Sequence, residues 1–376
     1  MNPASAGFFI AAERVMTPAR VGNTGSWRYD FTGNNHKEEE KMRNSTILCA
    51  AAAMMLAVIP IQGLAQYKNE YTVSTVLPAP FPWGEAAERW AELVDERSNG
   101  EINFKVYPNA ELVSGNQTRE FPALRSGVID FAIGSTINWS PQVPELNLFS
   151  LPFLMPDYEA IDALTGGETG EMIFEAVRAK GVVPLAWGEN GFRELSNSNG
   201  VIDEPSDLEG MKIRVVGSPL FEDTFNALGA NPTQMSWADA KPALSTGAVD
   251  GQENPLSVFH IANIHEVGQT YLTRWHYMAD PLIFAANRNI WASFSPEDQA
   301  MIKQAAVDAG LWEIEQSRAA VPSLRGAIEE RGVTITELTD EQVAEFRDAT
   351  TSVYEEWTPQ IGAELVETAR EAIANR

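Results

Sequence analysis

Residues 212–254 read KIRVVGSPLFEDTFNALGANPTQMSWADAKPALSTGAVDGQEN, and the apolar pattern of this stretch sets the expected architecture. Short apolar runs have the length of strands, and the segments between them carry apolar residues at helical spacing. The expected elements are, in order, strand 212–216, helix 219–228, strand 232–236, helix 237–246 and a short strand at 248–250. Strands that alternate with helices indicate a sheet with parallel strands, because a helix is the usual crossover between them.

The same order of elements appears on both sides of this stretch. Upstream we expect strand 71–77, helical spacing over 86–94, strand 102–106, helix 117–126, strand 129–133 and strand 182–187. Residues 137–156 are rich in Pro, Trp and Leu and have little helical period, and residues 152–156 within them predict extended chain. A helix is expected to start at Glu168. Downstream we expect strand 281–286, a helix over 296–330 that Pro322 kinks or divides, strand 333–337 and acidic helices. Two sets of strand–helix units predict an α/β protein with two lobes, each a mostly parallel sheet flanked by helices.

Composition is consistent with a large, two-domain chain. The 376 residues are 44% hydrophobic and 21% charged, which is ample for a sizeable core. The formal net charge of −25 argues against nucleic acids and anionic membrane surfaces as partners, since both attract clustered Lys and Arg.

The N-terminal region has the pattern of an export signal. Met42-Arg43 precedes an apolar run at 47–59, and small residues follow it up to Ala65. This predicts a signal peptide over 42–65, cleaved after Ala65, and a periplasmic protein that does not insert into the membrane. Residues 1–41 fit no part of such a signal and are interpreted as a mis-called extension. The single cysteine, Cys49, lies in the signal, so the mature chain has no disulfide, reactive thiol or Cys-based metal site.

Arg214 is the principal candidate for binding, since it lies inside the strand predicted at 212–216. A buried arginine requires an anion, which is either an acidic side chain of the same lobe or a ligand. Residues 250–255, DGQENP, predict a tight polar turn after a neighbouring strand. Asn254 in that turn offers both a donor and an acceptor, which suits fixing a carboxylate beside a guanidinium and favours the ligand.

The other candidates remain open from the residues alone. Arg193, in a Gly-Phe-Arg turn, is equally suited to a structural ion pair and to a ligand. Trp237 follows a strand end, where it is either the wall of a pocket or the anchor of a helix. His260 and His265 lack the spacing of a zinc pair, and there is no serine-nucleophile motif. No metal, cofactor or catalytic group is therefore predicted.

Five segments together resemble the substrate-binding proteins of TRAP transporters, of the DctP type. They are 107–112 YPNAEL, 185–193 LAWGENGFR, 208–215 LEGMKIRV, 228–233 LGANPT and 243–255 ALSTGAVDGQENP. The resemblance covers essentially the whole mature chain, and the DGQENP element after the KIRV strand is its most specific part.

The resemblance implies site residues, a fold and a partner. The arginine that pairs bidentately with the ligand carboxylate falls on Arg214, a second site arginine on Arg193, the carboxylate-fixing asparagine on Asn254, and a ligand-packing aromatic on Trp237. Such proteins have a periplasmic-binding-protein-like fold whose two lobes close over the ligand, with a long helix across both. On this basis we expect lobe I over 67–190 and 280–319, and lobe II over 191–279 and 320–376. The loaded protein is expected to dock on a membrane permease driven by an ion gradient.

Two departures narrow the expected ligand. Where some sialic-acid-binding members carry a glutamate, this chain has GST at 134–136, which makes Ser135 the site candidate. Where the ectoine-binding member has an acid, this chain has VLP at 76–78, which disfavours a zwitterion. The expected ligand is a compact organic acid such as a C4-dicarboxylate. The alternatives are a secreted hydrolase with a carboxylate pair and a ligand-sensing subunit of a signalling receptor.

Overall fold

The computed structural model describes residues 67–376. The predicted extension 1–41, the signal peptide 42–65 and Cys49 lie outside the described residues. Within residues 67–376, no helix has the length and apolar character needed to cross a membrane.

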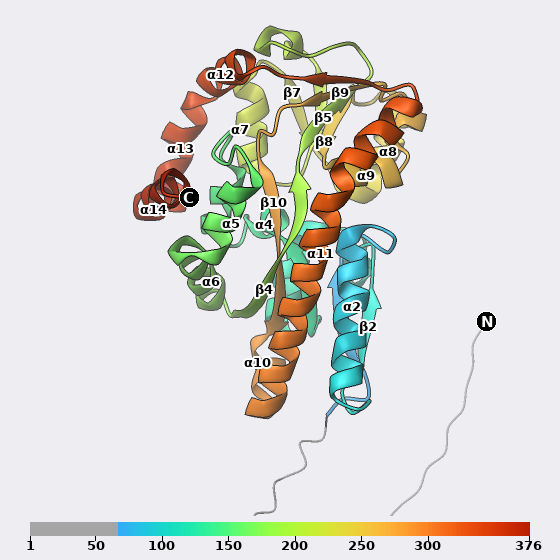
Figure 1. Ribbon diagram of the computed structural model, residues 1–376, viewed down its shortest axis with the longest axis vertical. Helices are drawn as coiled ribbons and strands as arrows, with labels where there is room; N and C mark the ends of the chain where they lie inside the picture. Colours follow the sequence, from blue (N-terminus) through green and yellow to red (C-terminus); the bar gives the residue numbers. More distant parts are fainter. Residues whose placement is uncertain (1–66) are drawn as a thin grey trace, which may run out of the picture. The chain divides into compact units, whose positions relative to one another are not determined.

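The first sheet has five strands (Figure 1). They are β1 (Tyr71–Thr75), β2 (Phe104–Tyr107), β3 (Phe131–Ser135), β4 (Val182–Phe192) and β10 (Ala279–Asn287), in the order β2-β1-β3-β10-β4. β1 runs parallel to β2 and β3, whereas β10 runs antiparallel to β3 and β4. The sheet is mixed because β10 brings the chain back from the second sheet in the opposite direction.

The second sheet has six strands. They are β5 (Glu194–Asn197), β6 (Lys212–Val215), β7 (Asn231–Gln234), β8 (Gly251–Asn254), β9 (Tyr271–Arg274) and β11 (Thr334–Glu337), in the order β11-β9-β5-β8-β6-β7. β6 is parallel to β7 and β8, and β9 to β11, while β5 is antiparallel to both of its neighbours. Two mixed sheets flanked by helices confirm the expected α/β class.

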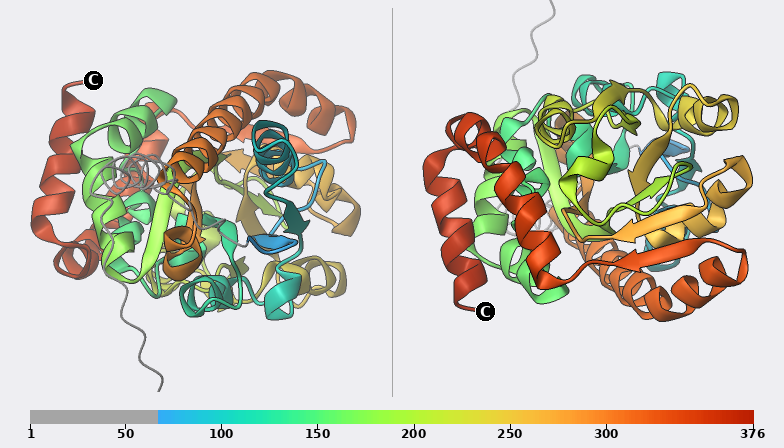
Figure 2. Two further views of the ribbon diagram at one scale, coloured as in Figure 1. Left: turned by 90° about the horizontal axis from the view of Figure 1, so that it is seen from below. Right: turned by 90° about the horizontal axis from the view of Figure 1, so that it is seen from above.

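Helices connect and cover these strands. The α-helices are α2 (Pro82–Arg97), α3 (Glu120–Ser126), α4 (Thr136–Trp139), α5 (Tyr158–Gly166), α6 (Glu168–Ala179), α7 (Pro219–Ala227), α8 (Trp237–Thr246), α9 (Leu256–Ile261), α10 (Arg288–Ala292), α11 (Pro296–Glu330), α12 (Asp340–Ala349), α13 (Thr351–Ile361) and α14 (Ala363–Ala374). Short 3-10 helices are η1 (Glu111–Val113), η2 (Gln117–Arg119), η3 (Pro144–Ser150), η4 (Pro205–Leu208) and η5 (Ile264–Val267). The C-terminal helices lie beside the helices that cover β4, with α14 packed on α5 and α6 (Figure 2).

The β4–β5 segment and the helix α11 link the two sheets. β4 continues to Phe192, beyond the predicted end at 187, and leads through Arg193 directly into β5. α11 packs along α2 and β4 and reaches α9 at its other end (Figure 1). Gly310 allows this contact, because a Cβ there would lie 2.1 Å from the carbonyl oxygen of Trp187. The long helix is therefore confirmed, and it is undivided at Pro322, which removes only one backbone donor.

Residues 137–156 contain α4 and η3, which are too short to display a helical period, whereas residues 152–156, expected as extended chain, lie in no helix or strand. One local prediction was wrong. The polar residues 250–255, expected as a tight turn after a strand at 248–250, instead contain β8. β8 lies between β5 and β6, so its backbone is paired on both sides and its polar side chains are buried. Nothing in the local sequence distinguishes such a buried polar strand from a turn.

The lobe boundaries predicted at 190/191, 279/280 and 319/320 remain a prediction. The sheets exchange chain between β4 and β5 and again between β9 and β10, close to the first two of these points. The C-terminal helices contact elements from both parts of the chain. α13 packs on η3, which follows β3 of the first sheet, and on α7, which follows β6 of the second.

Candidate functional site

A cavity lies between the strand ends of the two sheets. All five residues predicted for the site line it: Ser135, Arg193, Arg214, Trp237 and Asn254. Strand ends and loops from both sheets supply them, which is where α/β sheets bind ligands.

Arg214 is the third residue of β6, and its side chain is almost completely buried, with 1% exposure. Its Nε and Nη2 donate to the carbonyl oxygen of Met235 at 3.2 and 2.9 Å. Among residues 67–376 no carboxylate lies within ion-pair distance of this guanidinium. Burial lowers the pKa of Arg214 to about 10, so the group stays charged at neutral pH. The structural salt bridge considered from the sequence is absent from the described part of the chain.

Arg193, by contrast, is paired with two carboxylates. Its Nε and Nη2 contact the carboxylate of Glu253, and its Nη1 lies 3.3 Å from Asp280. Tyr277 also donates its hydroxyl to Glu253, at 3.0 Å. Burial opposes the charge of Arg193, but the two carboxylates outweigh it and raise the pKa. The structure thus contains the ion pair that the sequence left as one alternative, although Arg193 also faces the cavity.

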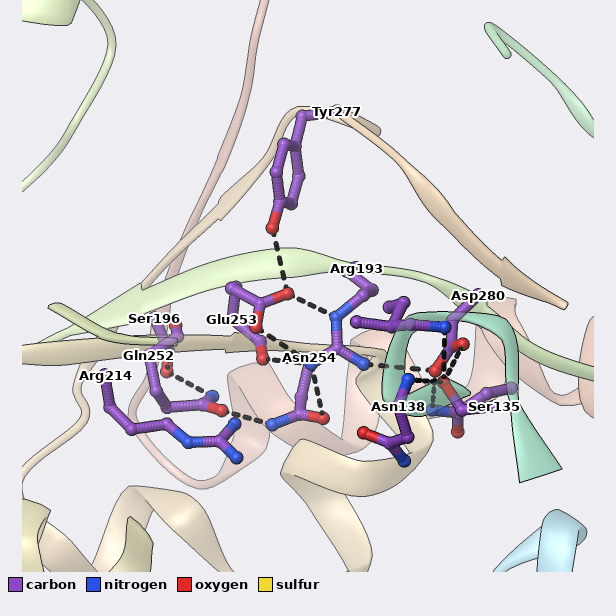
Figure 3. Close-up of polar contacts among 12 residues, drawn as sticks. Ser135, Asn138, Arg193, Ser196, Arg214, Gln252, Glu253, Asn254, Tyr277 and Asp280 are labelled. Atoms are coloured by element: carbon purple, nitrogen blue, oxygen red, sulfur yellow. Dashed lines mark hydrogen bonds and ion pairs between the residues drawn. The ribbon is translucent and has the colours of Figure 1, made fainter. Parts of the chain in front are cut away.

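Asn254 is oriented between these two arginines (Figure 3). Its Oδ1 accepts from Arg193 Nη2 at 3.1 Å, and its Nδ2 donates to Gln252 Oε1. Gln252 in turn donates to the hydroxyl of Ser196 at 2.9 Å. This chain of amides fixes the side chain of Asn254 at the cavity wall.

Ser135 and Trp237 have structural partners as well. The hydroxyl of Ser135 donates to Asp280 and accepts from the backbone N–H of Ile137 at 3.1 Å, which caps α4. Trp237 begins α8, and its ring centroid lies 5.9 Å from Cζ of Arg214, within reach of a cation–π interaction.

Sequence reasoning missed four polar residues of the cavity: Gln117, Asn138, Asn190 and Asp280. Asn190 lies inside the quoted segment 185–193 and could have been proposed from it. Asp280 directly precedes the strand predicted at 281–286, a position shared with other strand-end candidates. Gln117 and Asn138 carry no signal that separates them from surface polar residues.

The remaining wall of the cavity is apolar. It consists of Val76, Leu77, Trp83, Ile137, Val216 and Val258. The cavity therefore combines one guanidinium that has no acidic partner in the described chain with amides and a hydrocarbon surface. This arrangement suits a small anion with a partly apolar body.

Contacts across the cavity hold its two sides together. Gln117 accepts from the backbone N–H of Trp237 at 2.8 Å and donates to Asn138 at 3.0 Å. A Cβ on Gly217 would lie 2.9 Å from the methyl group of Thr118, so these two segments also touch. These contacts join segments that follow strands of the two sheets.

Close to the cavity wall, Glu120 is a fully buried acid without a cationic partner in the described chain. It accepts from the hydroxyl of Ser74 at 2.7 Å and from Nε1 of Trp139 at 3.3 Å. Burial outweighs these hydrogen bonds and raises the pKa of Glu120 from 4.5 to about 7. The folded state therefore holds a proton that the unfolded state releases between pH 4.5 and 7.

We expect this group to make the protein less stable as pH rises through that window, by about 3 kcal/mol at most. Glu120→Gln stays neutral, so its loss of stability between pH 5 and pH 8 should be smaller than that of the wild type. Urea unfolding at the two pH values measures the difference. Identical losses in both proteins would contradict this assignment.

The model of the bacterial extracellular solute-binding proteins, family 7, matches residues 73–360. The chain belongs to that family. A solved TRAP periplasmic solute-binding protein of Ralstonia eutropha H16 is 60% identical, with a TM-score of 0.82, and the match covers 82% of this chain and 100% of that one. That protein holds (S)-2-acetolactate, which is (S)-2-hydroxy-2-methyl-3-oxobutanoate.

More distant members of the solute-binding family bear different ligand names. The C4-dicarboxylate-binding periplasmic protein DctP of Rhodobacter capsulatus is 31% identical over 80% of this chain and 90% of its own length. A TRAP solute-binding protein of Sulfurospirillum deleyianum with bound succinate is 30% identical, with a TM-score of 0.75, covering 80% of this chain and 97% of that one. Membership of this family confirms the resemblance to TRAP solute-binding proteins, which are receptors rather than enzymes.

Proposed function

We propose that this solute-binding protein captures a small monocarboxylate in the cavity and delivers it to a TRAP permease from the periplasm. One observation carries the proposal: Arg214 is buried at the cavity wall and has no acidic partner among the described residues. The desolvation of that charge is offset when a ligand carboxylate pairs with it. Asn254 would fix the same carboxylate, and Trp237 would pack on the ligand.

The number of unneutralised cations favours one carboxylate over two. Arg193 already pairs with Glu253 and Asp280, which leaves Arg214 as the one lining arginine in the described chain without a carboxylate. A dicarboxylate would place its second charge near Asp280 or against the apolar wall. Both positions are unfavourable in a cavity of low dielectric constant.

The Ralstonia relative supports a branched hydroxy-oxo acid as the ligand class. Its acetolactate has one carboxylate, one hydroxyl, one oxo group and two methyl groups. In this cavity an arginine can pair with the carboxylate, several side-chain amides can bond to the hydroxyl and oxo groups, and a hydrocarbon wall can contact the methyl groups. The relatives named for C4-dicarboxylates support the competing expectation, so succinate belongs in the same experiment.

Closure of the cavity would complete binding. Excluding water strengthens the pair between Arg214 and the carboxylate, because the local dielectric constant falls. A hydrolase with a carboxylate pair is less well supported, since Asp280 is the only acid among the described residues that line the cavity. No feature of the described chain favours a sensing subunit over transport.

We expect 2-acetolactate and related 2-hydroxy and 2-oxo monocarboxylates to raise the melting temperature of the purified protein, and succinate to raise it less. At a given concentration, a ligand that binds only the native state stabilises it more the tighter it binds. A thermal-shift screen followed by calorimetry measures the order. The ligand recovered after denaturation should be unaltered. Tighter binding of succinate, or conversion of the ligand, would contradict the proposal.

A further inference from the structure

Asp280 is the acidic side chain that faces the cavity and that neither the sequence motifs nor the proposed carboxylate site uses. It lies near the start of β10, opposite Gly191 of β4 and two residues before Leu282, which is the register partner of Ser135 on β3. Its side chain is 2% exposed. Three strand ends thus hold one buried carboxylate at the cavity wall.

Three donors fix the orientation of this carboxylate (Figure 3). Oδ1 accepts from the hydroxyl of Ser135, while Oδ2 accepts from Asn190 Nδ2 at 2.9 Å and lies 3.3 Å from Arg193 Nη1. An ionised carboxylate has about four acceptor positions, so the group retains capacity for a further donor from the cavity. A ligand hydroxyl would form a charge-assisted hydrogen bond there.

Asp280 and Arg214 both line the cavity, on different strands. Figure 3 shows Arg214 on one side of Asn254, and Asp280 with Arg193 on the other. A ligand whose carboxylate pairs with Arg214 would therefore extend towards Asp280. The ligand group that lies next to Asp280 would then determine the affinity for different short acids.

We propose that Asp280 determines specificity, because it accepts a hydrogen bond from a ligand hydroxyl and its charge excludes a second carboxylate. This inference rests on the proposed function, in which Arg214 holds the first carboxylate. The simpler alternative is that Asp280 only balances the charge of Arg193. That role predicts no preference for a ligand hydroxyl, whereas selection by Asp280 depends on the group that the ligand presents.

Two ligands of nearly the same shape separate these roles in the wild-type protein. 2-Hydroxy-2-methylbutanoate and 2,2-dimethylbutanoate differ only by a hydroxyl in place of a methyl group. We expect calorimetry to show the hydroxy acid binding roughly 10- to 100-fold more tightly, since the dimethyl acid has no hydroxyl to donate to the carboxylate of Asp280. Equal affinities would overturn the inference while leaving the monocarboxylate function intact. Failure of both acids and of 2-acetolactate to bind would remove the proposed function itself.

A charge-neutral variant then assigns the preference to this residue. Asp280→Asn should bind 2-hydroxy-2-methylbutanoate about 10-fold more weakly and 2-hydroxy-2-methylbutanedioate more strongly than the wild type. A fold defect would weaken both ligands together, so opposite changes identify Asp280. Asp308→Asn, which changes a surface acid paired with Arg97, should leave both affinities unchanged. An Asp280→Asn protein with the wild-type preference for the monocarboxylate would overturn the inference.

Discussion

Arg214→Lys is expected to weaken binding of the cognate acid by about 100-fold or more, the largest change that we predict for any substitution. Lysine keeps the positive charge but cannot reproduce the planar, bidentate fork that a carboxylate requires. In the structure the Nε and Nη2 atoms of Arg214 both donate to the carbonyl oxygen of Met235, which orients the guanidinium. Nη1 does not take part in this contact. Isothermal titration calorimetry with 2-acetolactate measures the loss.

A surface arginine provides the matched control. Arg178 pairs with the exposed Glu175 on α6, so Arg178→Lys should leave the affinity unchanged. Circular dichroism of Arg214→Lys should match that of the wild type, because the substitution removes no acidic partner. If Arg214→Lys bound the cognate acid with unchanged affinity, the role of Arg214 as the carboxylate anchor would be lost.

Glu253→Gln is expected to lower the free energy of unfolding by about 3 kcal/mol, because it leaves a buried guanidinium with half of its counter-charge. Arg193 contacts both carboxylate oxygens of Glu253, and Tyr277 donates to the same group. A glutamine amide would direct N–H donors at the donors of Arg193. Urea unfolding at pH 7 without ligand measures the change.

The control for this prediction is an ion pair whose carboxylate is exposed to solvent. Arg274 lies 2.7 Å from Glu337, whose side chain is 42% exposed. Glu337→Gln should cost less than about 1 kcal/mol, since exposed pairs are screened by water. Equal, small losses of unfolding free energy in both variants would show that Glu253 is not needed to stabilise the buried charge of Arg193. The main role of Arg193 would then be to bind the ligand.

Local sequence patterns were sufficient for the elements with a clear period. The alternation of short apolar runs and helical spacing predicted β6, α7, β7 and α8 to within two residues at each end. It failed for η3 and β8, where one or two helical turns and a buried polar strand have no distinctive period. The extension of β4 to Phe192 was also missed, since glycine and polar residues interrupt its apolar run.

Five of the residues that line the cavity were named from the sequence, whereas the charge balance of the cavity was not predicted. Arg214 and Asn254 followed from a strand arginine and a polar segment that are close in sequence. Gln117 and Asp280 were missed, because each reaches the cavity from a distant segment and is an ordinary polar residue locally.

By itself, the sequence determined an α/β protein with two sets of strand–helix units and a long helix, and it placed an arginine at a strand end. Only the tertiary structure decided which arginine is available to a ligand. Arg193 meets Glu253 and Asp280 across separations of 60 and 87 residues, through the pairing of β5 with β8 and of β4 with β10. The pairing register between strands that are distant in sequence sets those contacts, and this register cannot be read from the local pattern of residues.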